Sequence, residues 1–151
     1  MSRTNRLEAF HDAFDVLCGR KLGEGLSRKV YECDILPGYV VKVEEDSSYR
    51  QNVMEMEIWM SVVGTPASRW FAECKCISPN GKILIMEQSR RPSTSELLAE
   101  IPIWFTDVKV ANWGMVKSRD GSTELLVCHD YGYSNILYRG TRTKRMKKAD
   151  W

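Results

Sequence analysis

The chain has 151 residues, 43% of them hydrophobic, and a formal net charge of +2. This size and composition predict one globular unit, or two small lobes that share a cleft, and exclude two independent domains. No apolar run reaches the roughly 18 residues that a membrane span needs, and the N-terminus MSRTNRLEAF is polar. We therefore expect neither a membrane span nor a signal peptide.

The cysteines indicate the compartment of the protein, and the distribution of charged residues indicates a candidate binding segment. The five cysteines are odd in number and show no C-x-x-C spacing, which is typical of free thiols in a reducing compartment. We therefore expect a cytoplasmic protein. Six basic residues lie in the stretch 139–148, whereas residues 1–138 hold 16 basic and 19 acidic side chains. We expect this basic stretch to be a solvated tail, or else to bind nucleic acid or an acidic partner.

The first periodic segment, residues 5–18, has the sequence NRLEAFHDAFDVLC. Asn5 and Glu8 have the spacing of a capping box, which predicts a short amphipathic helix. His11 lies near the edge of the apolar face, where we expect a packing or surface residue rather than a metal ligand. The apolar face consists of Leu7, Phe10, Phe14, Leu17 and Cys18.

Residues 21–44 predict three antiparallel strands, with a glycine-containing turn between the first two. Pro37-Gly38 is the turn signal that precedes the third strand. Gly23 and Gly25 lack a Cβ atom, so the backbone amides near them can approach an anion such as phosphate. A plain turn is the alternative interpretation of these two glycines.

Lys42 lies within an apolar strand, between Val41 and Val43. A lysine in such a position needs a partner for its ammonium group. The helix expected over residues 48–63 brings Glu55 to the border of its inward face, whereas Glu57 points outward. Two glutamates on a solvated face are the alternative interpretation. The apolar surface of this helix consists of Met54, Ile58, Trp59 and Val62.

Two hairpins and one short helix are expected further along the chain. Residues 71–78 and 82–87 flank Pro79-Asn80-Gly81, which is a hairpin signal. One short helix is expected over residues 94–100. The run KSRDGST after Val116 indicates a second turn, and the apolar residues 125–128 predict a buried strand that leads to Asp130.

The second hairpin sets two polar groups of residues at the same end. Asp107, Lys109 and Asn112 precede its first strand, and Asp130-Tyr131-Gly132 follows its second strand. Two carboxylates and an amide are therefore expected to converge where the strands meet. Such groups suit the binding of Mg²⁺ and the acceptance of a proton from an attacking hydroxyl group.

The order of these motifs resembles that of the protein-kinase family. LGEGLSRKVY is similar to the glycine loop LGxGxxGxVY, VVK is similar to the strand V-A-[IV]-K, and D-x-K-x-x-N and D-[FY]-G begin at Asp107 and Asp130. The resemblance covers residues 22–132. It implies an α+β, protein-kinase-like fold: an antiparallel five-stranded N-lobe with one main helix over residues 1–88, a much reduced catalytic lobe over residues 89–138, and the basic tail 139–151.

The resemblance implies that ATP binds to the first lobe. Gly23 and Gly25 would cover its phosphates, and Val30 would pack on the adenine ring. Lys42 would hold the α- and β-phosphates, in an orientation that Glu55 fixes.

The adenine ring would also meet the strand that ends this lobe. Met86 would be the gatekeeper, and the backbone of Glu87 and Ser89 would lie at the adenine edge. The third glycine of the family pattern is Arg28 here, which bars the closest backbone approach and places a basic group within reach of phosphate.

The resemblance also implies the catalytic groups. Asp107 would accept or orient the proton of the attacking hydroxyl group, Lys109 would neutralise the γ-phosphoryl group, and Asn112 with Asp130 would hold Mg²⁺. The His-Arg pair that precedes the aspartate in many kinases is Phe105-Thr106 here. Only nineteen residues follow Gly132, so there is no A-P-E motif and no platform for a protein substrate.

We therefore expect a minimal, ATP- and Mg²⁺-dependent phosphotransferase that acts on the hydroxyl group of a protein or a small molecule. The alternative is a kinase-shaped binding protein that does little chemistry and occupies a host or regulatory partner, as expected of a compact phage gene. A nucleic-acid-binding domain led by the basic tail is a third hypothesis. Apolar surface left by the short second lobe would favour a homodimer.

Overall fold

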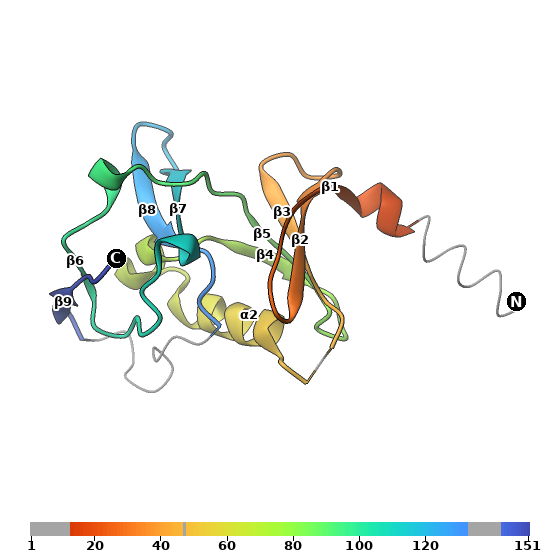
Figure 1. The fold of residues 1–151 in the computed structure, drawn as a ribbon, viewed down its shortest axis with the longest axis horizontal. Coiled ribbons are helices and arrows are strands. Elements are labelled where there is room, and N and C mark those ends of the chain that lie inside the picture. Colours follow the sequence, from red (N-terminus) through yellow and green to blue (C-terminus); the bar gives the residue numbers. More distant parts are fainter. Residues whose placement is uncertain (1–12, 47, 133–142) are drawn as a thin grey trace, which may run out of the picture.

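The computed structural model describes residues 13–46, 48–132 and 143–151 as a mixed α+β fold. Its main sheet contains β1 (Cys18–Glu24), β2 (Arg28–Cys33), β3 (Tyr39–Glu44), β4 (Cys74–Ile77) and β5 (Ile83–Glu87). These five strands are antiparallel and run in the order β1-β2-β3-β5-β4 (Figure 1). The prediction of a five-stranded antiparallel sheet with one main helix is therefore confirmed. No helix among the described residues is long and apolar enough to cross a membrane.

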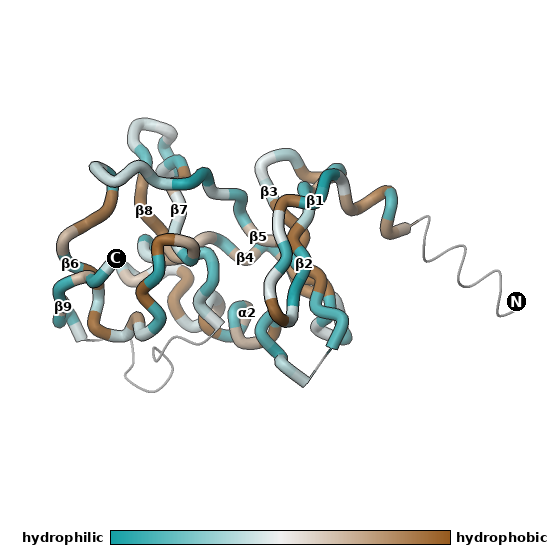
Figure 2. Tube along the Cα trace, in the orientation of Figure 1, coloured by the Kyte–Doolittle hydropathy of each residue, from teal (hydrophilic) through white to brown (hydrophobic). Residues whose placement is uncertain are grey.

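The two faces of this sheet pack against different parts of the chain. Val40 belongs to the main hydrophobic core, whereas its neighbour Val41 faces a smaller cluster on the opposite side. Strand alternation produces this division, because successive side chains point to opposite faces. Figure 2 shows that hydrophobic and hydrophilic residues both occur along the strands of this sheet.

The N-terminal helix, expected over residues 5–18, ends one residue earlier than the sequence predicts. Residues 13–17 are helical, and Phe14 packs edge-on against Tyr31 with ring centroids 5.3 Å apart. Cys18 is the first residue of β1 rather than the last of the helix, because its backbone pairs with Cys33. The expected cap and the first part of the apolar face, with His11, fall outside the described residues.

Helix α2 (Gln51–Val62) follows the prediction closely. Ile58, Trp59 and Val62 are buried against the core. Glu55 faces inward and is fully buried, whereas Glu57 is exposed. The interpretation that placed Glu55 rather than Glu57 on the inner face is confirmed.

The second half of the chain consists of short strands and single turns. Strands β7 (Trp113–Lys117) and β8 (Glu124–Cys128) form the expected hairpin, and β6 (Glu100–Pro102) pairs with β9 (Met146–Lys148). Beyond Val62, the part of the chain that the structure describes contains no α-helix but three 3₁₀ turns: Pro66–Trp70, Thr94–Glu96 and Val110–Asn112.

The short helix expected over residues 94–100 is wrong. Only Thr94–Glu96 turns, with Ser93 and Glu96 capping each other, and the chain then extends into β6. Pairing of Glu100 with Lys148 satisfies the backbone there, so a strand replaces the rest of the expected helix.

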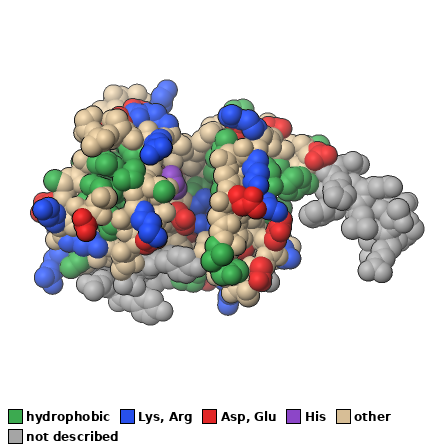
Figure 3. All heavy atoms as spheres, viewed as in Figure 1, with side chains coloured by type: hydrophobic (Ala, Val, Ile, Leu, Met, Phe, Trp, Pro, Cys, Tyr) green, Lys and Arg blue, Asp and Glu red, His purple; other side chains and the backbone are tan. Residues whose placement is uncertain are grey.

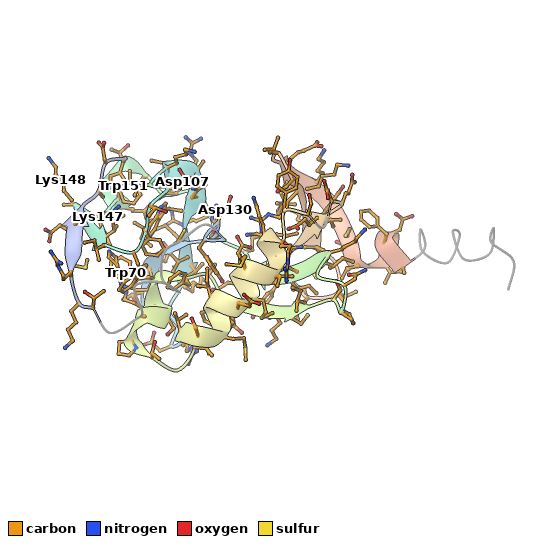
Figure 4. All side chains as sticks on the ribbon, turned by 90° about the horizontal axis from the view of Figure 1, so that it is seen from below. Trp70, Asp107, Asp130, Lys147, Lys148 and Trp151 are labelled. Atoms are coloured by element: carbon orange, nitrogen blue, oxygen red, sulfur yellow. The ribbon has the colours of Figure 1, made fainter. Side chains whose placement is uncertain are left out.

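The described end of the basic stretch is bound to the body of the protein. The indole nitrogen of Trp151 donates a hydrogen bond to the carbonyl oxygen of Leu98 at 2.8 Å, and its ring meets Trp113 edge-on at 5.4 Å. Figure 4 shows Trp151 beside the body, near Lys147 and Lys148 of β9. From residue 143 onward, the stretch is therefore part of the fold rather than a solvated tail.

We expect Trp151→Ala to lower the free energy of unfolding by about 2 kcal/mol, because the substitution removes an aromatic pair and its buried area. Urea denaturation followed by circular dichroism measures the change. Lys148→Ala, at an exposed position of the neighbouring strand, is the matched control and should change the value by less than about 0.5 kcal/mol. Equal values for the two variants would contradict the docking of Trp151.

Candidate functional site

A cavity of about 340 Å³ lies between the sheet and the two residues Ala111 and His129, which flank the β7–β8 hairpin in the sequence. Its volume is within the range of about 300–1,000 Å³ that is typical of small-molecule sites. Figure 3 shows the hollow between the two halves of the molecule. Six of the residues proposed to contact a nucleotide line it: Gly23, Val30, Lys42, Met86, Glu87 and Ser89. The structure therefore brings these six residues together at one cavity from segments far apart in the chain, while their contact with a nucleotide stays a prediction.

Gly25 lies outside this cavity, in the tight turn between β1 and β2. Its amide nitrogen donates a hydrogen bond to the carbonyl oxygen of Arg28 at 2.8 Å. Together with Leu26 and Ser27, it lines a second hollow of about 310 Å³. The structure thus brings Gly23, but not Gly25, to the cavity.

Lys42 and Glu55 form a buried ion pair at the base of the cavity. The ammonium nitrogen of Lys42 lies 2.9 Å from Oε2 of Glu55, and it also donates to the backbone carbonyl oxygen of His129. Lys42 has its central place in the sheet because β3 pairs with both β2 and β5, opposite Val30 and Leu84. Glu55 is therefore the partner that the ammonium group of Lys42 was expected to need within the apolar strand.

Arg28 contributes a second cation, which binds Glu55 from the other side. Its Nη1 lies 2.7 Å from Oε2 of Glu55 and its Nη2 lies 3.0 Å from Oε1, which is a bidentate pair. The same Nη2 donates to Oδ1 of Asp130 at 2.7 Å. One guanidinium group therefore joins β2, helix α2 and the segment after β8.

The sequence pattern did not predict that Arg28 binds Glu55 and Asp130. It indicated only that Arg28 bars the closest backbone approach and lies within reach of phosphate. A signal for it exists in strand alternation. Arg28 and Val30 are two residues apart on β2 and must share a face, so the face that was expected to meet adenine also carries the guanidinium group.

The two cations hold Glu55 in its charged form. Burial alone would raise the pKa of this carboxyl group, but the charges of Lys42 and Arg28 outweigh it and lower the pKa to about 2. In return, the pKa of Arg28 rises above its ordinary value, because Glu55 and Asp130 outweigh the effect of burial. The ion pairs are therefore complete at neutral pH.

Asn52 fixes the start of helix α2 to the sheet and was also missed in the sequence. Its amide nitrogen donates to the carbonyl oxygens of Lys42 and Lys82, at 3.2 and 3.1 Å. Its backbone nitrogen donates to the buried carboxylate of Glu44 at 3.0 Å. Since Glu55 lies one turn further along the helix, these bonds also set the position of Glu55.

Asp107, Lys109 and Asn112 lie together, as expected. The ammonium group of Lys109 lies 3.0 Å from the Asp107 carboxylate, and the amide nitrogen of Asn112 donates to Oδ2 of Asp107 at 3.1 Å. The side chain of Asp107 is 46% exposed, so an outside hydroxyl group can reach it.

The β7–β8 hairpin brings Asn112 next to His129, the residue before Asp130. Trp113 pairs with Cys128, and the backbone nitrogen of His129 donates to the carbonyl oxygen of Asn112 at 2.9 Å. The backbone of Asn112 therefore lies next to the residue that precedes Asp130, while the expected convergence of the two carboxylates and the amide stays a prediction. Figure 4 labels Asp107 and Asp130 at this side of the hairpin.

Tyr131 anchors the segment that carries Asp130. Its backbone nitrogen donates to Oε1 of Glu55 at 3.2 Å, and its hydroxyl group donates to the carbonyl oxygen of Ala72 at 2.9 Å. The ring is buried against Phe71, with centroids 4.9 Å apart. Asp130 is thus held by its neighbour on one side and by Arg28 on the other.

His129 connects the cavity wall to the hairpin. Its Nε2 lies 2.9 Å from the carbonyl oxygen of Ala111, which only accepts, so Nε2 carries the hydrogen. Its Nδ1 then accepts a hydrogen bond from the hydroxyl group of Ser89 at 2.7 Å. Burial, together with the nearby charge of Lys42, lowers the pKa of His129. A neutral imidazole therefore lines the cavity.

Asn112 and Asp130 supply oxygen ligands of the kind that Mg²⁺ prefers. The described residues contain no group of three or more histidine, cysteine, aspartate or glutamate side chains that could hold a metal ion. Mg²⁺ is usually bound through one or two protein ligands together with substrate phosphates and water. In the chemical type of their oxygen atoms, Asn112 and Asp130 suit Mg²⁺, but Oδ1 of Asp130 already accepts a hydrogen bond from Arg28.

No family model matches the chain, and no curated protein gives a match. The chemistry of the site is therefore argued from its geometry. Two buried cations, Lys42 and Arg28, an exposed carboxylate and the cavity are joined by the hydrogen bonds and ion pairs described above.

Proposed function

We propose that the protein is a minimal, protein-kinase-like phosphotransferase that binds ATP in the cavity and transfers its γ-phosphoryl group to a hydroxyl group. The observation that carries the proposal is the buried ion pair between Lys42 and Glu55, 2.9 Å long, at the base of a cavity of about 340 Å³. The ammonium group of a lysine fixed in this way keeps one hydrogen that it can donate to a phosphate oxygen. The strand order of the sheet and the position of α2 support the kinase-like interpretation.

The adenine ring is proposed to lie between Val30 and Met86, with the segment from Glu87 to Ser89 at its edge. Val30 and Met86 supply apolar surface, while Gly23 leaves room for the phosphates because no other atom lies within 4 Å of where its Cβ would be. Lys42 then contacts the α- and β-phosphates from strand β3 of the sheet. These residues come from four strands or loops of one rigid sheet, so little ordering is needed on binding.

The catalytic step is proposed to occur at Asp107. Its exposed carboxylate accepts a hydrogen bond from the acceptor hydroxyl group and takes its proton as the bond from that oxygen to the γ-phosphorus forms and the bond to the bridging oxygen of ADP breaks. Asn112 keeps the carboxylate oriented by donating to it, and Lys109 stabilises the negative charge of the transferred group. Mg²⁺ held by Asn112 and Asp130 would supply further charge neutralisation.

A kinase-shaped binding protein is the second candidate. It is favoured by Arg28, which engages Asp130 directly. In that case the charged network stabilises the fold and the surface occupies a partner.

Nucleotide binding separates the two candidates. We expect Mg²⁺-ATP at a hundredfold excess over its Kd to raise the free energy of unfolding by about 2.7 kcal/mol. Ala111→Trp, which places an indole ring at an exposed edge of the cavity, should remove this gain while leaving the ATP-free stability nearly unchanged. Denaturation curves with and without Mg²⁺-ATP test both expectations, and an unchanged curve for the wild-type protein would favour the binding protein.

A further inference from the structure

Asp130 ends a series of three ion pairs, Lys42–Glu55, Glu55–Arg28 and Arg28–Asp130, in which two positive and two negative charges balance. The buried carboxylate of Glu44 lies outside this series but also acts electrostatically on Arg28. Without Arg28, the same group would carry one net negative charge. Such a group would attract a divalent cation and repel the phosphates of a nucleotide.

The guanidinium group of Arg28 is fixed in the place where it balances Asp130. Its Nη1 donates to Asn52 and Glu55, and its Nη2 donates to Glu55 and Asp130. These bonds use all four hydrogens of the two terminal nitrogens. Because the side chain is only 7% exposed, water screens its charge weakly.

We propose that Arg28 is the built-in counter-cation of Asp130, so that the cavity binds a nucleoside triphosphate without a divalent cation. The proposal rests on the proposed nucleotide site. Arg28 removes the charge that would otherwise repel the phosphates, while Lys42 contacts them directly. The second oxygen of Asp130 remains available to Mg²⁺, so the requirement for the metal belongs to phosphoryl transfer and not to binding.

The test is the affinity of the full chain for ATP, measured by isothermal titration in excess EDTA and again in excess Mg²⁺. Wild-type affinities in the two buffers should agree within about threefold, whereas Arg28→Gln should bind about tenfold or more weakly in EDTA than in Mg²⁺. Arg28→Lys keeps the charge but loses the bidentate bonds, so it should bind ATP in EDTA more tightly than Arg28→Gln. The proposal is overturned if the wild type itself loses about tenfold or more of its affinity in EDTA. It is equally overturned if Arg28→Gln binds alike in both buffers.

The wild-type comparison stands even if both Arg28 variants fail to fold, which circular dichroism would show. A chain that binds no ATP in either buffer contradicts the proposed function.

In that case, a titration with Mn²⁺ alone decides the role of Arg28. Electron paramagnetic resonance measures the concentration of free Mn²⁺. The wild type should show no saturable Mn²⁺ site, whereas Arg28→Gln should have one. Adding Asp130→Asn to Arg28→Gln should remove that site. Saturable binding by the wild type that Asp130→Asn abolishes would overturn the proposal, as would its absence from a folded Arg28→Gln protein.

Discussion

Glu55→Gln is expected to lower the free energy of unfolding by about 3–5 kcal/mol, because it removes the shared partner of two buried cations. Lys42 and Arg28 are 5% and 7% exposed, and neither can recover its lost bonds from water without opening the fold. Urea denaturation at neutral pH measures the loss. Glu57→Gln, on the exposed face of the same helix, is the matched control and should change the value by less than about 0.5 kcal/mol.

The pH dependence of this loss identifies its cause. The pKa of Glu55 is about 2 in the folded protein, against an ordinary value of 4.5. A lowered pKa means that the unfolded chain takes up the proton first, so the stabilisation is complete above pH 4.5 and is lost as the pH falls toward 2. The difference in stability between the wild type and Glu55→Gln should therefore narrow across this range. A difference that stays constant would contradict the ion-pair origin.

Asp107→Asn and Asp130→Asn are each expected to reduce phosphoryl transfer by about a thousandfold or more. Asparagine keeps the shape of the side chain, but it neither accepts the proton of a hydroxyl group at Asp107 nor offers a charged oxygen at Asp130. Transfer of label from γ-labelled ATP to the protein itself, to a generic protein substrate and to water measures the rate.

Structural damage and loss of catalysis can be told apart in this experiment. The side chains of Asp107 and Asp130 are 46% and 43% exposed, so both variants should remain folded by circular dichroism. Asp150→Asn, at an exposed position near the C-terminus, should retain full activity. Wild-type turnover by Asp130→Asn would contradict its assignment as a metal ligand.

Features of the fold that depend on local patterns could be predicted from the sequence. Pro37-Gly38 marks the turn before β3, where Gly38 has a φ angle of 84° that suits glycine. Helical periodicity placed Glu55 inward and Glu57 outward, and the hairpin signal placed Asn112 next to the residues before Asp130. In each case the signal lies within a few residues of the feature, or on two paired strands.

Features that depend on distant contacts could not be predicted in this way. Arg28 binds Glu55 and Asp130, which lie 27 and 102 residues further along the chain, and no local pattern encodes such a meeting. Similarly, β6 exists because β9 pairs with it, and the basic character of β9 suggested a solvated segment. The partners of Trp151 and Asn52 are likewise visible only once the chain is folded.

The central claim is that ATP binds in the cavity between the sheet and the residues Ala111 and His129, with its phosphates at Lys42. A crystal structure of the full chain with a non-hydrolysable ATP analogue and Mg²⁺ tests it most directly. We expect the adenine ring against Val30 and Met86, and a phosphate oxygen within hydrogen-bond distance of the Lys42 ammonium group. An analogue bound elsewhere, or a cavity that stays empty at saturating concentration, would contradict the claim.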